Sequence, residues 1–197
     1  MIKYPNGQKF EPTGSKKQRK NNVDISLSSA NRGMDLEGDI NKSNEYYKNS
    51  GICLITKRPT PINVVKVDYS KGARITDAYF EKQSTTDYNG VYKGKYIDFE
   101  AKNTNSKTSF PLSNISKHQI EHLKNVIQHG GFAFFIIEFA KLSEVYLLDA
   151  SFVINFYENG ERKSIPYDVF TKNGIKLKLG FAPRIDYIEA VEEKYFK

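Results

Sequence analysis

The sequence is poor in cysteine and has no long apolar run, and each shortage excludes a class of protein. A single cysteine, Cys53, rules out a disulfide framework within one chain. Its place in the apolar run ICLIT predicts a buried strand residue in a reducing compartment. No stretch approaches the roughly 20 apolar residues of a membrane span, and none resembles the apolar core of a signal peptide. We therefore expect a cytoplasmic protein with no membrane partner.

Acidic residues are also in deficit, because 30 Lys and Arg stand against 23 Asp and Glu, for a formal charge of +7. This excess favours a polyanionic partner. Residues 1–32 hold seven of the basic residues against Glu11 and Asp24, which gives +5 of the total. With almost no apolar periodicity there, residues 1–31 are predicted to form a basic arm that orders only on a polyanion. A solubilising tail is the alternative.

The rest of the chain, residues 32–197, is long enough for one α/β domain with a sizeable core. Helical spacing over residues 34–50 predicts a helix with Leu36, Ile40 and Tyr47 inward, which ends near Gly51. Further elements follow from alternating or continuous apolar runs: strands at 52–57, 62–68, 75–80, 132–139 and 144–149, a short helix between Pro166 and Gly174, and a terminal helix at 185–195 with Ile188 and Val191 inward.

The segment TTDYNGVYKGKYIDFEAK, residues 85–102, contains the most informative pattern. The turn at residues 93–95 separates two alternating runs, which predicts a β-hairpin. On its second strand Asp98, Glu100 and Lys102 share one face, and pairing with the first strand brings Asp87 beside them. Two carboxylates and a backbone carbonyl make the hard oxygen set that Mg²⁺ prefers, and a lysine beside them suits a phosphoryl oxygen or the attacking water. The pattern predicts a metal-dependent nuclease site.

Other interpretations of the same pattern stay open. The E-x-K spacing also occurs at Glu161 and at Glu192, in a turn-like and a helical context respectively. The hairpin face itself equally suits a solvated row of charges on an edge strand.

Five blocks of the chain resemble the RecU family of Holliday-junction resolvases, a branch of the PD-(D/E)xK nuclease superfamily. They occur in family order: NRGMDLEGDIN from residue 31, KRPTPINVVKVDY from 57, AYFEKQSTTDYNGVYKGKYIDFEAK from 78, TSFPLSN from 108 and HQIEHLK from 118. The resemblance implies a restriction-endonuclease-like α/β fold, in which helices flank a mixed central sheet, with a projecting β-ribbon stalk inserted at about 58–79.

The resemblance also implies roles for particular residues. Thr85, Asp87, Glu100 and Gln119 match the Mg²⁺-binding positions, and Lys102 matches the lysine that stabilises the transition state. Thr85 lies two residues before Asp87, so it could supply a hydroxyl or a water-mediated oxygen on the same strand face; an ordinary β-branched strand residue is the alternative. Gln119 has a rival role, because Ser-Lys-His-Gln from residue 116 matches a capping box that opens a helix.

One competing motif lies in the same helix. The run from His118 to His122 matches the H-x-x-E-H signature of inverted zinc peptidases, with Glu121 between them. No third protein ligand is signalled, and a basic chain suits an anionic substrate better than a peptide. These histidines and His129 are expected to lie at the surface as polar side chains or to contact phosphate.

Several residues are expected to support the site or contact DNA. Glu37 lies on the first helix, where many PD-(D/E)xK nucleases place a glutamate that supports the metal, although plain solvation fits as well. By the resemblance, the stalk enters the centre of a four-way junction; its tip, Ser-Lys-Gly from residue 70, keeps only the lysine of the family's usual Pro-Lys-Arg-like sequence. The basic residues expected to contact DNA are Arg32, Lys57, Arg58, Lys66, Lys71 and Arg74.

The expected activity is Mg²⁺-dependent hydrolysis of backbone phosphodiesters that leaves a 5′-phosphate. Paired symmetric nicks in a Holliday junction fit a two-fold homodimer with one site per subunit. Branch-migration or strand-exchange proteins are expected partners by the resemblance. The alternatives are a general duplex or repair nuclease, and a DNA-binding protein without catalysis.

Overall fold

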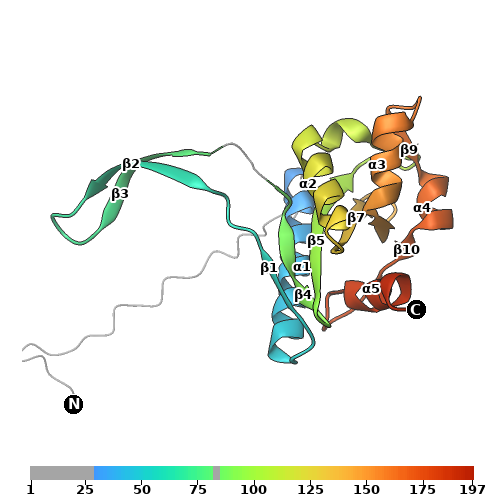
Figure 1. Cartoon of the computed structure of the whole chain (residues 1–197), viewed down its shortest axis with the longest axis horizontal. Helices are drawn as coiled ribbons and strands as arrows, with labels where there is room; N and C mark the ends of the chain where they lie inside the picture. The colour runs from blue at the N-terminus through green and yellow to red at the C-terminus, as the bar shows by residue number, and fades with distance from the viewer. Residues whose placement is uncertain (1–28, 82–84) are drawn as a thin grey trace, which may run out of the picture.

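The computed structural model describes residues 29–81 and 85–197, with side chains from Leu36 onward. Its centre is a six-stranded mixed sheet in the order β1-β4-β5-β7-β8-β10 (Figure 1). Neighbouring strands are antiparallel except β5 and β7, which run parallel. The strands of this sheet are β1 (Leu54–Lys57), β4 (Tyr88–Tyr92), β5 (Lys95–Thr104), β7 (Phe132–Phe139), β8 (Glu144–Asp149) and β10 (Ile175–Lys176).

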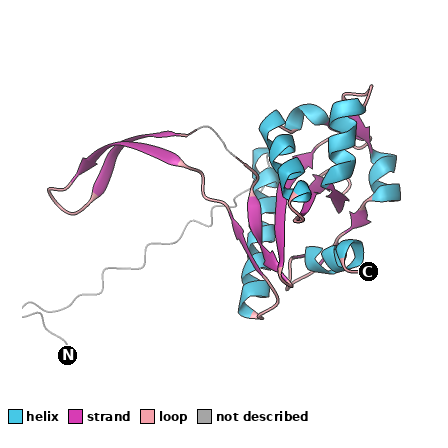
Figure 2. Ribbon diagram, viewed as in Figure 1, coloured by secondary structure: helices cyan, strands magenta, loops and turns pink. Residues whose placement is uncertain are grey.

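Helices cover both faces of the sheet (Figure 2). On one face, α1 (Ser29–Asn49) and α5 (Tyr187–Tyr195) pack in one apolar cluster. On the other face, a second cluster joins α2 (Lys117–Gln128), α3 (Ala150–Asn159) and α4 (Tyr167–Asn173). The predicted α/β architecture, a mixed central sheet flanked by helices, is confirmed.

The position of β7 in the middle of the sheet explains why its sequence, FAFFIIEF, is almost entirely apolar. Phe134 and Ile136 pack in the cluster under α1 and α5, whereas Phe135 and Ile137 pack in the cluster under α2 to α4. A strand covered on both faces needs apolar side chains at successive positions. The bounds predicted for β7 and β8 are confirmed.

The first helix forms as its spacing predicts. Leu36, Ile40 and Tyr47 are all buried against the sheet, and Gly51 adopts a positive φ just beyond the end of α1. The expectation for Cys53 was wrong, because this residue lies just before β1 and is only half-buried. β1 is an edge strand, so its neighbours Leu54 and Thr56 face outward and only Ile55 is fully covered.

A two-stranded ribbon projects from the body of the protein (Figure 1). It pairs β2 (Ile62–Asp68) with β3 (Arg74–Phe80) in antiparallel register. Nearly every side chain on it is exposed, including Val65, Tyr69 and Phe80. The predicted projecting ribbon is therefore present, and the alternative of a hairpin packed on the sheet is wrong.

The remaining elements are short and lie at the periphery. The helix between Pro166 and Gly174 and the terminal helix form as predicted, although the latter begins at Tyr187, after a two-residue strand. The sequence did not signal α3. The other short elements are β6 (Ser109–Pro111), η1 (Leu112–Asn114), β9 (Ser164–Pro166), β11 (Lys178–Leu179) and β12 (Ile185–Asp186). In the described part of the chain, no helix has the length and apolarity to span a membrane.

Candidate active site

The hairpin of β4 and β5 forms in the register that carries the site. Ile97, Phe99 and Ala101 pack in the cluster under α1 and α5. Asp98 and Glu100 therefore point to the other face of the sheet, where their side chains contact α2. The pairing of Tyr88 with Phe99 sets the residue before β4 beside Glu100. Alternation along one strand thus places the acidic residues between the sheet and α2.

Asp87 and Glu100 are held together through the backbone. The amide of Asp87 donates to Oε2 of Glu100 at 3.1 Å, and the amide of Ala101 donates to Oδ2 of Asp87 at 3.2 Å. These reciprocal bonds fix both carboxylates at one end of the hairpin. Asp87 and Thr85 lie in the bend before β4 and not on the strand itself, so the expectation that Thr85 shares a strand face with Asp87 was wrong.

The Glu100 carboxylate is fully buried and has two further partners. Nζ of Lys102 lies 2.7 Å from Oε1, and Nε2 of Gln119 donates to the same oxygen at 2.5 Å. Burial raises the pKa of Glu100 to about 8; Asp87 adds to the rise, and the Lys102 ammonium opposes it. The raised pKa means that one lysine does not fully offset the desolvation of this carboxylate, so further positive charge would be favourable here.

A cavity of about 200 Å³ opens over these groups. One part of its wall comes from the hairpin and α2, and another from the segment that leads from β1 into the ribbon. The lining residues are Glu37, Lys57, Arg58, Pro59, Thr60, Pro61, Thr85, Thr86, Asp87, Glu100, Lys102 and Gln119. The structure thus brings all five residues that the resemblance singled out, Thr85, Asp87, Glu100, Lys102 and Gln119, to one pocket.

Gln119 takes both of the roles that its position allowed. Its Oε1 accepts from the backbone amide of Ser116 at 2.9 Å, which completes the capping box of α2. Its Nε2 points to Glu100. The amide oxygen is therefore occupied by the cap, and the amide nitrogen faces the carboxylate.

The donor set fits a hard divalent cation. Within the described residues no three Asp, Glu, His or Cys side chains cluster as a metal site; the two carboxylates that backbone hydrogen bonds hold together at the pocket are those of Asp87 and Glu100. Thr85, whose hydroxyl is a neutral oxygen donor, lines the same pocket. Oxygen ligands of this kind suit hard divalent cations.

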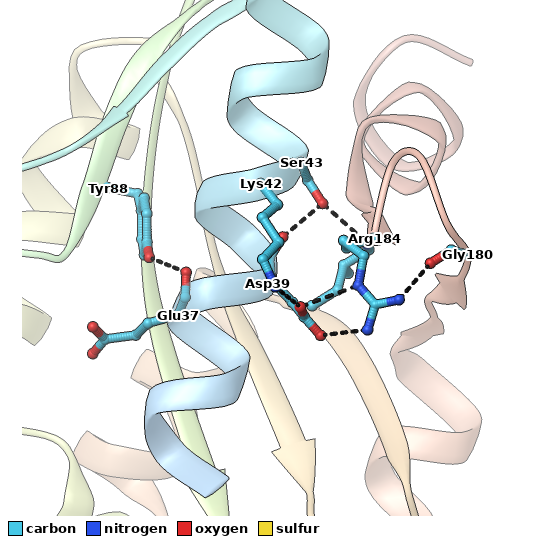
Figure 3. A network of polar contacts seen from close by, with 8 residues as sticks. Glu37, Asp39, Lys42, Ser43, Tyr88, Gly180 and Arg184 are labelled. Carbon is cyan, nitrogen blue, oxygen red and sulfur yellow. Dashed lines mark hydrogen bonds and ion pairs between the residues drawn. The ribbon is translucent and has the colours of Figure 1, made fainter. Parts of the chain in front are cut away.

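Glu37 lies at the edge of the same pocket. Its carboxylate pairs with Lys57 of β1, and its backbone carbonyl accepts from the Tyr88 hydroxyl at 3.2 Å (Figure 3). Its predicted support of the metal site stays a prediction. The structure shows that it joins α1 to β1 beside the pocket.

Asp98 is the functional candidate that the sequence did not single out. Its carboxylate is fully buried and accepts from Arg58 and from the Tyr96 hydroxyl, each at 2.8 Å. His122 Nε2 lies 2.9 Å away, and the Thr86 hydroxyl donates to the other oxygen. Alternation along β5 placed Asp98 on the face of Glu100. Nothing local in the sequence revealed partners so far away along the chain.

The histidines do not form a zinc site. His122 faces Asp98, Glu121 is exposed and pairs with Lys117, and His118 Nε2 is buried with no hydrogen-bond partner. His122 is not a free surface side chain, because it pairs with Asp98, whereas His129 is exposed at the end of α2; the expected phosphate contact of the histidines stays a prediction. The other two E-x-K matches lie away from the pocket. Glu161 is exposed in a loop, and Glu192 on α5 pairs with Lys93.

The basic residues expected to contact DNA fall into three groups. Lys66, Lys71 and Arg74 are exposed on the ribbon. Lys57 and Arg58 lie at the root of the ribbon, where Lys57 is paired with Glu37 and the Arg58 guanidinium with Asp98. The Arg32 side chain and residues 1–28 of the basic arm lie outside the described residues.

A mixed sheet flanked by helices, with Asp87, Glu100 and Lys102 at one pocket, agrees with what the resemblance to the PD-(D/E)xK superfamily implies. The model of the RecU family, Recombination protein U, matches residues 31–193, so this chain belongs to that family. A protein of Geobacillus sp. (strain WCH70) described as Holliday junction resolvase RecU is 51% identical, with 100% of this chain and 98% of the relative covered. The Holliday junction resolvase RecU of Geobacillus kaustophilus (strain HTA426) is also 51% identical, with 99% of this chain and 98% of the relative covered.

A further relative, Holliday junction resolvase RecU of Bacillus cereus (strain AH820), is 49% identical over 99% of this chain and 98% of its own. A solved structure of Archaeoglobus fulgidus Hjc, described as a Holliday junction resolvase, is more distant. It is 13% identical, with a TM-score of 0.44 over 73% of this chain and 94% of that one.

Proposed function

We propose that this chain is a Mg²⁺-dependent Holliday junction resolvase that acts as a homodimer in the cytoplasm during DNA recombination and repair. The convergence of Asp87, Glu100 and Lys102 in one pocket carries the proposal. The family to which the chain belongs and the projecting ribbon, whose root lines the pocket, support the choice of a four-way junction over other DNA.

The residues of the pocket have distinct roles in the proposed reaction. Asp87 and Glu100 would hold Mg²⁺, with Thr85 and Gln119 around them, the latter through water because its amide oxygen caps α2. Bound there, Mg²⁺ would offset negative charge on the phosphate and favour attack by water. Lys102, 2.7 Å from Glu100, donates to the attacking water or to a phosphoryl oxygen. Cleavage leaves a 5′-phosphate.

Lys66, Lys71 and Arg74 on the ribbon supply phosphate contacts, and the basic arm with Arg32 is proposed to add more. A two-fold dimer presents two such pockets to the two-fold symmetric strands of a junction, which is what paired nicks require. Branch-migration or strand-exchange proteins are proposed as further partners on the basis of the family alone.

The test is cleavage of an end-labelled, mobile-core four-way junction against a linear duplex of the same sequence, with Mg²⁺ and with EDTA. Paired symmetric nicks in the junction alone, lost with EDTA, support the proposal. Equal cutting of the duplex identifies a general nuclease, and binding without cutting identifies a DNA-binding protein.

A further inference from the structure

Asp98 is the point at which the segments around the pocket meet. Its buried carboxylate contacts Arg58 at the ribbon root, Thr86 beside Asp87, Tyr96 on its own strand and His122 on α2. It lies two residues before Glu100 on the same face of β5. Asp98 itself does not line the catalytic cavity.

Arg58 is fastened at both its backbone and its side chain. Its amide donates to the carbonyl of Asp87 at 2.7 Å, and its guanidinium donates to Asp98 at 2.8 Å. Residues 58–61, which follow directly from β1 toward the ribbon, line the catalytic cavity. The root of the ribbon is thus a part of the pocket wall, and Asp98 holds it there.

The ribbon has no other anchor within the described residues. No hydrogen bond or ion pair of these residues joins 62–80 to the body, and the bonds of Thr76 and Ser70 stay inside the ribbon. The position of the ribbon relative to Asp87 and Glu100 is therefore set at its root, where Arg58 and Asp98 meet.

We propose that Asp98 is a positioning residue that, through Arg58, sets the ribbon root against the catalytic carboxylates, so that DNA docked on the ribbon meets them in register. The inference rests on the proposed junction cleavage. A buried ion pair suits this role because it accepts one geometry, whereas apolar packing tolerates sliding. Misplacement of a bound substrate by 1 Å costs about 100-fold in rate.

The experiment compares Asp98→Asn, Arg58→Lys and Arg58→Gln with the unmodified protein. Steady-state kinetics are measured on the four-way junction and on linear duplex, and thermal unfolding is followed for each variant. Asp39→Asn is the control, because Asp39 pairs with Arg184 at 3.1 and 3.3 Å on the side of α1 opposite to Glu37 (Figure 3). This control breaks a bidentate carboxylate and guanidinium contact that does not touch the pocket.

We expect kcat on the junction to fall by about 10- to 100-fold in Asp98→Asn, with KM within about three-fold of the unmodified protein. Arg58→Lys should recover part of the rate that Arg58→Gln loses, and the Asp39→Asn control should keep the kcat of the unmodified protein. If Asp98→Asn does not fold, the two Arg58 variants answer the same question.

An unchanged kcat in Asp98→Asn, or in both Arg58 variants, overturns the inference. So does a loss of kcat that accompanies a lower unfolding temperature and that Arg58→Lys does not recover relative to Arg58→Gln, because that pattern is purely structural. Failure of the unmodified protein to cut a junction is a different result, which overturns the proposed function and the inference with it.

Discussion

Lys102 reaches the buried carboxylate of Glu100 from two residues along the same strand, with Nζ 2.7 Å from Oε1. The pair sits in the cavity with Asp87, and Lys102 remains partly exposed, which leaves the ammonium within reach of a substrate. Removal of the Lys102 ammonium should lower the rate of cleavage if the lysine is catalytic, and should leave that rate unchanged if the ion pair is only structural.

Lys102→Met should lower kcat for junction cleavage by about 100- to 1,000-fold, because one donor to the developing charge is lost. KM should change little if the lysine acts in the transition state alone. Single-turnover cleavage over a range of protein concentrations, all in excess over the junction, gives the maximal rate and the half-saturating concentration separately. Lys172→Met, an exposed lysine on α4 that also pairs with a carboxylate, is the control, and a similar loss in that variant would contradict the assignment.

The pKa of Glu100 predicts an unusual pH dependence for the metal-free protein. This pKa is about 8 in the folded protein against 4.5 ordinarily, so the folded state keeps a proton that the unfolded chain has released between those values. The free energy of unfolding should therefore fall as pH rises through this window. Chemical denaturation from about pH 4.5 to about pH 9 measures the slope, which Glu100→Gln should flatten.

The affinity for Mg²⁺ should depend on pH in the opposite direction to the free energy of unfolding. Because the ion binds the ionised carboxylate, its affinity should rise up to about ten-fold per pH unit below about pH 8 and then level off, with release of a proton. Calorimetry in two buffers of different ionisation enthalpy counts the protons. Binding that is equally tight across this range would show that Glu100 is not a ligand.

The exposed ribbon charges should determine how strongly salt weakens DNA binding. Replacement of Lys66, Lys71 or Arg74 by Gln should reduce the slope of log affinity against log salt by about 1 each. Thermal unfolding should not change, since no described residue of the ribbon pairs with the body. Fluorescence anisotropy with a labelled junction gives the slopes; Lys124→Gln on α2 is the control, and equal slopes in all variants would remove the ribbon from the DNA contact.

Replacement by alanine should have opposite effects on stability at two glycines, because their surroundings differ. A Cβ on Gly90 of β4 would lie 2.0 Å from the Leu54 carbonyl oxygen and 2.6 Å from the Ile55 Cα, so Gly90→Ala should displace β1 and with it the ribbon root. Gly38 on α1 has open space around it, and Gly38→Ala should stabilise the helix by about 0.5–1 kcal/mol. Thermal unfolding of both variants decides, and a stable Gly90→Ala would contradict the close packing of β1 on β4.

Those features of the fold that follow from alternation along a strand or from a continuous apolar run could be predicted from the sequence. The face shared by Asp98, Glu100 and Lys102 follows from the two-residue period of β5, and the bounds of β7 follow from its continuous apolar run. The helix α3 was missed because it starts directly at Ala150 after β8, with Asp149 as its cap and no turn residue between them. Strands of two or three residues have too few positions to show any period.

The partners of Asp98 were beyond prediction for a different reason. Arg58 is 40 residues away along the chain and His122 is 24, and they meet Asp98 only once β1, β5 and α2 have packed. A polar side chain on a strand face looks the same in sequence whether it faces water or a buried arginine. Only the tertiary arrangement decides which one it is.

The parallel pairing of β5 with β7 has a consequence for the order in which the protein is built. The β4–β5 hairpin closes over a two-residue turn, whereas β7 and α2 join it only through a crossover that starts after Thr104 and ends at Phe132. Local pairs form faster than distant ones. In any state of the chain in which α2 has not packed on the hairpin, Asp98 and Glu100 lack His122 and Gln119 and remain open to solvent, so the burial of the acidic pair depends on the docking of α2.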